Sequence, residues 1–168
     1  LEYIEAKWLF GLDTHVEIIV HPQSIVHSMI EFVDTSIMAQ LGIPDMRVPI
    51  AYALTFPERM ECALPTLDLA AIKQLTFEEP DYEKFPCIKL AQDSLEAGHS
   101  MPAVLNAANE VAVQAFLDEE IAFKEIAETI RIAMNNHKPH NIDSLEDVQS
   151  ADRWARDEVK KLITVTTH

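Results

Sequence analysis

The strongest constraint on the fold is the helical pattern in the second half of this 168-residue chain. Apolar residues recur there at helical spacing, and Pro, Gly or Ser stands where helices usually begin or end. We predict four helices, at 86–97, 100–118, 123–136 and near 151–163. Ser144 and Ser150 are predicted as successive N-caps before the last of them. Their apolar stripes indicate a four-helix bundle.

The first 57 residues differ, because they contain runs rich in Ile, Val, Met and Phe. These runs predict strands at Val16–Val20, Ile25–Val33 and Ser36–Leu41. The middle run alternates in polarity, which predicts a sheet with one core face and one polar face. Asp34-Thr35 joins the last two runs at a hairpin position. Asp45 is predicted to cap a short helix that ends before Pro57.

The chain begins inside a helical pattern. Leu1–Phe10 reads as an amphipathic helix with Leu1, Ile4, Trp8 and Phe10 on its apolar side, and no start signal precedes it. We therefore expect the chain to be the C-terminal portion of a longer protein.

Residues 58–85 show no sustained period and contain Pro65 and Pro80, which predicts an extended linker with at most a short helix at Leu67–Leu75. The predicted class is α+β, with three zones at 1–57, 58–85 and 86–168.

Composition excludes several functions. The net charge of −15 opposes nucleic-acid binding, because a nucleic-acid partner needs a basic footprint. Only three glycines are present, so neither of the common Gly-rich phosphate loops occurs. Two cysteines, Cys62 and Cys87, have no disulfide-framework or zinc spacing, which favours a reducing cytosol. No apolar run is long enough to span a bilayer and no export or targeting segment is seen, so we expect no membrane partner.

Several residues have both a structural and a chemical interpretation. Glu2 and Glu5 lie three apart on one helical face, where carboxylates hold Mg²⁺ or Mn²⁺ or act as a base, although such pairs are common on solvated helices. The segment His21–Met29 places two imidazoles beside a predicted strand. His21 as a strand cap and His27 as a half-buried structural histidine remain the plainer alternatives. Met46 projects from a constrained loop and is suited to form an apolar wall against a ligand.

Four motifs together resemble the 1-deoxy-D-xylulose 5-phosphate reductoisomerases: LEYIEA at 1–6, HPQSIVHSM at 21–29, AQLGIPDMR at 39–47 and LNAANEVAVQAFL at 105–117. The resemblance implies an NADPH-dependent and divalent-metal-dependent enzyme. It converts 1-deoxy-D-xylulose 5-phosphate into 2-C-methyl-D-erythritol 4-phosphate in non-mevalonate isoprenoid synthesis and works as a homodimer. The chain would hold the later part of a mixed α/β catalytic domain, the linker and the C-terminal bundle. The domain that binds most of the NADPH would precede Leu1, so we expect the isolated chain to be inactive.

The resemblance also implies roles for single residues. Glu2 matches an acidic Mg²⁺ or Mn²⁺ ligand that lies against the phosphorylated sugar substrate, and Glu5 matches an acid beside it. His27 matches a histidine on the catalytic side of the sheet, and we predict His27 and Glu5 as catalytic residues. Met46 matches an apolar residue near the nicotinamide of the cofactor. The expected compartment is a bacterial-type cytoplasm or a plastid-type compartment. A non-catalytic helical dimerisation or scaffold module is the alternative function.

Overall fold

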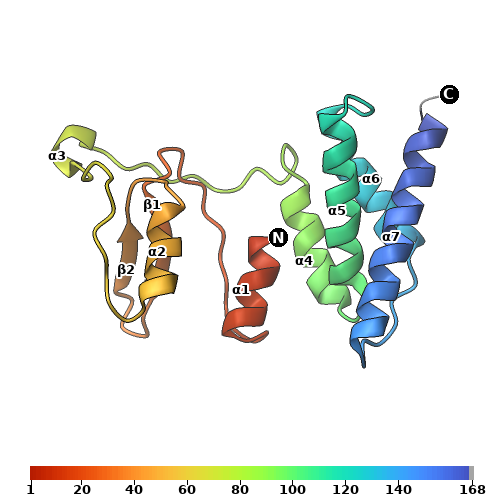
Figure 1. Ribbon diagram of the computed structural model, residues 1–168, viewed down its shortest axis with the longest axis horizontal. Coiled ribbons are helices and arrows are strands. Elements are labelled where there is room, and N and C mark those ends of the chain that lie inside the picture. The colour runs from red at the N-terminus through yellow and green to blue at the C-terminus, as the bar shows by residue number, and fades with distance from the viewer. Residues whose placement is uncertain (167–168) are drawn as a thin grey trace. The chain divides into compact units, whose positions relative to one another are not determined.

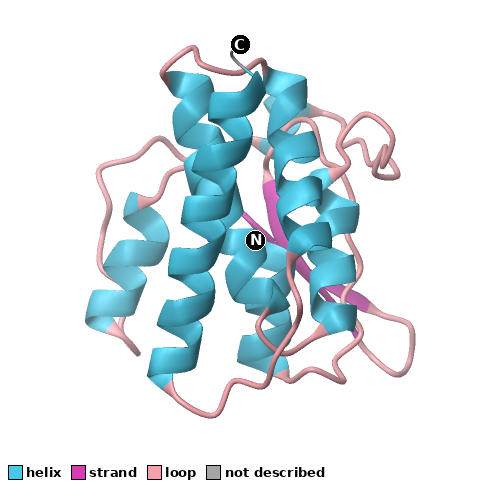
Figure 2. Cartoon of the chain, turned by 90° about the vertical axis from the view of Figure 1, so that its right-hand side faces the viewer, coloured by secondary structure: helices cyan, strands magenta, loops and turns pink. Residues whose placement is uncertain are grey.

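The structure is a computed structural model, which describes residues 1–166. The described part combines helices with one two-stranded antiparallel sheet, which confirms the α+β class (Figures 1 and 2). The elements in chain order are α1 (Glu2–Phe10), β1 (Val26–Glu31), β2 (Ile37–Leu41), α2 (Arg47–Thr55), α3 (Leu69–Ile72), α4 (Cys87–Ala97), α5 (Met101–Leu117), α6 (Phe123–Asn136) and α7 (Leu145–Thr166).

The chain divides into two compact units, which we describe separately. The helical unit contains Leu1–Ile18 and the chain from Asp81 onward, and the sheet unit contains Ile19–Pro80. Helix α1 thus belongs with the later helices by its contacts and not with the strands that follow it in sequence. This division differs from the three zones read from composition, because composition does not reveal that Ile4 of α1 packs into the helical core.

Helix α5 is the centre of the helical unit. It packs against α4, α6 and α7, while α1 packs against α4. Small side chains on α5, among them Ala107, Ala108 and Ala112, are fully buried and allow the neighbouring helices to approach closely. Ile130 of α6 and Val159 of α7 fill the space between them. The predicted apolar stripes of this region therefore face a common core.

The ends of these helices follow the signals in the sequence, with one exception. Gly98 ends α4 with a φ of 65°, a backbone conformation that costs glycine little. The prediction of a last helix that starts near residue 151 is wrong, because α7 begins at Leu145 and continues through Ser150. Ser144 is the actual cap. Its Oγ accepts the Asp147 N–H at 3.3 Å, and the Asp147 carboxylate accepts the Ser144 N–H at 2.9 Å.

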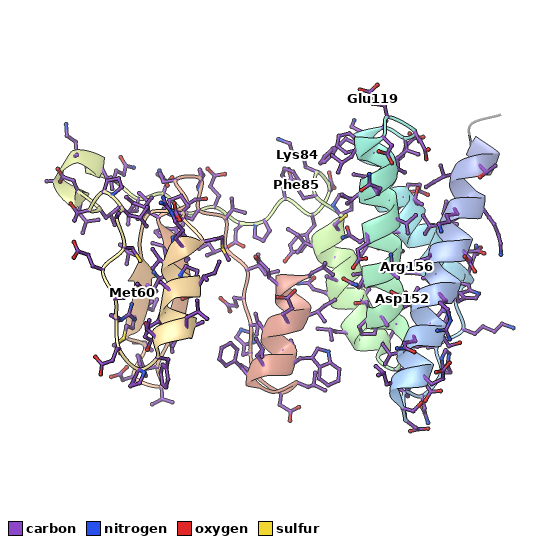
Figure 3. All side chains as sticks on the ribbon, viewed as in Figure 1. Met60, Lys84, Phe85, Glu119, Asp152 and Arg156 are labelled. Carbon is purple, nitrogen blue, oxygen red and sulfur yellow. The ribbon has the colours of Figure 1, made fainter. Side chains whose placement is uncertain are left out.

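A polar network joins α5 to α7. Arg156 of α7 binds Asp152 one turn earlier, with 2.8 Å between Nε and Oδ2, and also binds Glu110 of α5, with 2.6 Å between Nη2 and Oε2. Figure 3 labels Arg156 and Asp152 on α7. Hydrogen bonds from Arg156 and then from Asn106 lower the pKa of Glu110. The network lies at the surface, so its contribution to stability is modest.

The sheet unit has little core of its own. Strands β1 and β2 form the predicted hairpin, and Thr35 adopts a φ of 68° in its turn. Both faces of β1 are largely exposed, so the expected core face is not buried within this unit. Helix α2 buries none of its residues, and Ile25 is the buried apolar residue that precedes the sheet.

Two further predictions are wrong. Val16–Val20 forms no strand, because within the described residues only Val20 finds a partner, an isolated bridge to Glu78. On α1, Ile4 is buried, but Trp8 and Phe10 of the predicted apolar side are 65% and 75% exposed. Strand propensity and apolar character do not produce burial where this chain supplies no opposing surface.

Candidate functional site

The two carboxylates of α1 are presented to solvent. Glu2 and Glu5 occupy the first part of the helix, where its positive dipole end favours negative charge. Burial of Ile4 in the helical core fixes the helix that carries them. Both side chains are exposed, and neither forms an ion pair or a hydrogen bond with another described residue.

Exposed carboxylate oxygens are the donors that Mg²⁺ and Mn²⁺ prefer, so Glu2 and Glu5 fit a hard divalent cation chemically. Within residues 1–166, no group of three or more His, Cys, Asp or Glu side chains is arranged to hold a metal. The described residues therefore offer only part of a complete ligand set.

His27 lies at an irregularity in β1. Val26 pairs with Leu41 and Ser28 pairs with Gln40, so His27 is the extra residue of a β-bulge. A bulge bends the strand and redirects the side chain that it carries, and bulges are frequent beside active sites. The simple alternation predicted from the sequence therefore fails at the histidine itself.

The ring of His27 is oriented by a backbone carbonyl. Its Nε2 lies 3.2 Å from the Gly42 oxygen, which can only accept, so Nε2–H is the donor and Nδ1 is left as the acceptor of the neutral ring. Gly42 in turn donates its N–H to the Ile25 oxygen at 2.9 Å. Gly42 thus holds both the histidine and the start of its strand. The side chain of His27 is exposed and not buried as the structural alternative supposed.

The loop after β2 presents Met46. Asp45 fixes this loop, because its Oδ1 accepts the Arg47 backbone N–H at 2.9 Å, and its Oδ2 binds the Arg47 guanidinium at 2.7 Å. The hydrogen bonds from Arg47 lower the pKa of Asp45 to about 2, so this carboxylate stays charged near neutral pH. Met46 is 69% exposed at the start of α2. The prediction that Asp45 caps this helix is wrong, because the N-cap of α2 is Met46 and Asp45, one residue earlier, braces the loop through Arg47.

The predicted site residues fall on both compact units. Glu2 and Glu5 belong to the helical unit, and His27 and Met46 belong to the sheet unit, so neither unit alone brings all four together. Within the sheet unit, His27 binds Gly42, which lies four residues before Met46 in the chain.

The sequence did not predict the partner of the HPQS segment, residues 21–24. His21 and Gln23 bind Thr76, more than 50 residues later in the chain. No local pattern near Thr76 signals such a contact. Separately, no described helix has both the length and the apolar character needed to cross a membrane.

Comparisons with known proteins agree with the resemblance. The family model described as "DXP reductoisomerase C-terminal domain" matches residues 41–158. The chain is 57% identical to the 1-deoxy-D-xylulose 5-phosphate reductoisomerase of Geobacter metallireducens over 97% of its own length, and 54% identical to that of Chlorobium phaeobacteroides over the same share. It covers 43% of each, and so spans less than half the length of these curated relatives.

Solved structures give the same result. The reductoisomerase of Zymomonas mobilis, solved in complex with NADPH, is 48% identical with a TM-score of 0.80, over 88% of this chain and 39% of that one. A second reductoisomerase, solved with fosmidomycin and magnesium, is 36% identical with a TM-score of 0.85, over 99% of this chain and 44% of that one. The chain therefore belongs to the 1-deoxy-D-xylulose 5-phosphate reductoisomerase family.

Proposed function

We propose that this chain is the C-terminal part of an enzyme that converts 1-deoxy-D-xylulose 5-phosphate into 2-C-methyl-D-erythritol 4-phosphate. The substrate rearranges to a branched aldehyde, and NADPH supplies the hydride that reduces it. The observation that carries the proposal is 57% identity over 97% of the chain to a reductoisomerase. Because the chain covers only 43% of that relative, the activity is proposed for the complete protein.

The domain organisation of the complete enzyme is part of the proposal. Residues 1–57 would form the later part of a mixed α/β catalytic domain, 58–85 the linker, and 86–168 a C-terminal four-helix bundle. The mutual packing of α4, α5, α6 and α7 supports the last of these. A preceding domain would bind most of the NADPH, and the enzyme would work as a homodimer in a bacterial-type cytoplasm or a plastid-type compartment.

Glu2 would bind the divalent metal and lie against the substrate, with Glu5 beside it. When bound, Mg²⁺ or Mn²⁺ would act as a Lewis acid on the oxygens of the substrate and stabilise the negative charge that develops during the rearrangement. The exposed Glu2 carboxylate, which has no competing partner among the described residues, supports this role. Glu5 would act on the reacting groups through its position next to Glu2.

His27 would orient the substrate or relay a proton. With its Nε2–H donated to the Gly42 oxygen, the atom available for either task is Nδ1, which accepts a hydrogen bond or a proton. Met46 would form an apolar contact near the nicotinamide, and its exposed thioether on a fixed loop supports that role.

The direct test is oxidation of NADPH by the purified full-length enzyme. We expect oxidation that depends on both 1-deoxy-D-xylulose 5-phosphate and a divalent metal, and none from the 168-residue chain alone. A full-length protein that folds, binds neither NADPH nor substrate, and still forms dimers through its helices would favour the non-catalytic dimerisation module instead.

A further inference from the structure

The HPQS segment, residues 21–24, binds the linker through side-chain hydrogen bonds to Thr76. His21 Nδ1 donates to the Thr76 carbonyl oxygen at 2.7 Å. Gln23 Oε1 accepts the Thr76 backbone N–H at 3.2 Å, and Gln23 Nε2 donates to the Thr76 hydroxyl at 2.8 Å. The backbone and the side chain of Thr76 are therefore both engaged by two side chains that lie just before β1.

The contacts on either side of Thr76 extend this attachment. Val20 and Glu78 exchange two backbone hydrogen bonds of 2.9 Å each as an antiparallel bridge. The rings of His21 and Phe77 stack with 4.8 Å between their centroids and 22° between their planes. We call His21, Gln23, Thr76 and Phe77 the linker clasp. All of it lies within the sheet unit.

His21 is unsuited to proton transfer in this arrangement. Donation from Nδ1–H to a carbonyl leaves Nε2 without a proton in the neutral ring. That Nε2 is buried and has no hydrogen-bond partner among the described residues. The His21 ring is held by the hydrogen bond at Nδ1 and by stacking on Phe77, and its Nε2 is away from solvent. The side chain therefore serves to fix the position of the chain.

The clasp is connected to His27 by a short series of hydrogen bonds. The Ser24 N–H donates to the His21 oxygen at 3.0 Å and closes the turn that follows the clasp. Ile25 comes next, is buried, and accepts the Gly42 N–H. The Gly42 oxygen then accepts from His27 Nε2. These hydrogen bonds connect the linker, through Ile25 and Gly42, to the ring of His27.

We infer that His21 and Gln23 are positioning residues, which hold linker residues 76–78 against the segment before β1 and thereby fix the place of the His27 ring. The inference rests on the proposed function, which assigns His27 to the active site. It separates the two histidines of the segment: His27 acts at the substrate, and His21 acts through it.

The experiment uses the full-length enzyme and four variants. Gln23→Ala removes both hydrogen bonds that Gln23 forms with Thr76, Thr76→Val removes those of the Thr76 hydroxyl, and Thr76→Ser keeps the hydroxyl. Gln74→Ala is the matched control, because Gln74 is an exposed glutamine on the same linker that takes no part in the clasp. For each variant, amide hydrogen exchange at residue 76 and at Glu78, kcat, the KM for NADPH, and the melting temperature are measured.

We expect Gln23→Ala to speed amide exchange at Thr76, because it removes the acceptor of that N–H. Both Gln23→Ala and Thr76→Val should lower kcat about tenfold, because a small misplacement of a reacting group is costly in rate. The KM for NADPH and the melting temperature should stay near wild type, since Gln23 is exposed and contributes little to a core. Thr76→Ser and Gln74→Ala should match the wild type in exchange and in rate.

Three outcomes would overturn the inference. Free exchange of the Thr76 amide in the wild type would mean that the clasp does not form. Faster exchange with unchanged kcat would mean that the clasp holds the linker without positioning His27, which overturns this inference alone. A folded wild-type enzyme without substrate-dependent NADPH oxidation would instead overturn the proposed function, and with it the assignment of His27.

Discussion

The helical unit and the sheet unit treat their apolar residues in opposite ways. Helix α5 buries Met101, Val104, Leu105 and a row of alanines, whereas α2 buries none of its residues. Ile130 is 2% exposed in the helical unit, while Ile30 and Ile37 on the strands are 62% and 63% exposed. Burial of apolar surface is the main favourable term in folding. The helical unit therefore contains its own source of stability, whereas the sheet unit buries few of its apolar side chains.

The predicted site residues lie outside the buried helical core. Glu2, Glu5, His27 and Met46 are all exposed, and none belongs to the core of α4 to α7. Substitutions in that core should thus change stability first, and substitutions at the exposed positions should change activity first.

The largest effect should come from cutting the chain at the unit boundary. We expect residues 81–168 to show a helical circular dichroism spectrum that melts cooperatively, because their helices share one core. Residues 19–80 should show no cooperative transition, since a two-stranded hairpin without a buried face is marginal in water. Cooperative melting of 19–80 alone would show that the sheet unit is stable by itself.

A matched pair of isoleucines sharpens the same contrast. Ile130→Ala should lower the free energy of unfolding of the full-length enzyme by about 2–5 kcal/mol, the usual cost of emptying a packed site. Ile30→Ala should change it by less than Ile130→Ala, because within this chain Ile30 is mostly exposed. Chemical denaturation followed by circular dichroism measures both. Equal losses would show that Ile30 is covered as tightly in the complete enzyme as Ile130 is here.

Substitutions at the exposed carboxylates Glu2 and Glu5 should change activity and leave stability nearly unchanged. Glu2→Gln keeps the volume but removes the charge, so we expect kcat of the full-length enzyme to fall at least about a hundredfold, the scale of one lost electrostatic contact. Glu5→Gln should lower kcat about tenfold, as expected for an acid that supports a metal ligand. The melting temperature without metal should be nearly unchanged in both, because both side chains are exposed.

Steady-state kinetics across a titration with Mg²⁺ checks this pair. A large loss for Glu5→Gln with near-native rates for Glu2→Gln would mean that the two acids are assigned the wrong way round. Native rates for both would remove α1 from the metal site.

The sequence predicted the parts whose signals are local. Helices α4, α5 and α6 matched to within about a residue, because their stripes, prolines and Gly98 lie inside or next to them. Helix α7 began earlier than expected, since Ser150 resembles a cap and only the pairing of Ser144 with Asp147 distinguishes the true start.

The parts that were missed depend on distant residues. Val20 finds its partner at Glu78, and Gln23 finds its partner at Thr76, which no window of sequence around either residue contains. The bulge at His27 arises from the register of two strands and not from either strand alone. The motifs indicated which residues of the candidate site matter, but the hydrogen bond that orients His27 required the fold.

The smallest effect should come from the histidines that join two loops of the helical unit. Ser100 is fully buried, and its Oγ lies 2.7 Å from His137 Nε2 and 3.3 Å from His140 Nδ1. Burial, and then the neighbouring His140, lower the pKa of His137. The folded state thus binds this proton less readily than the unfolded state does, so the contribution of His137 to stability is complete above its unfolded pKa of about 6.5 and is lost as the pH falls below it.

We therefore expect residues 81–168 to melt at a lower temperature at pH 5.5 than at pH 7.5, and His137→Gln to reduce that difference. His99→Asn is the matched control, since His99 is exposed and asparagine tolerates its φ of 54°. This control should keep the full difference between the two pH values. If His137→Gln kept it as well, the acid sensitivity would arise elsewhere, and the histidine would contribute to the helical unit through its bond to Ser100 and its packing against Trp154, at 4.6 Å between ring centroids, and not through its titration.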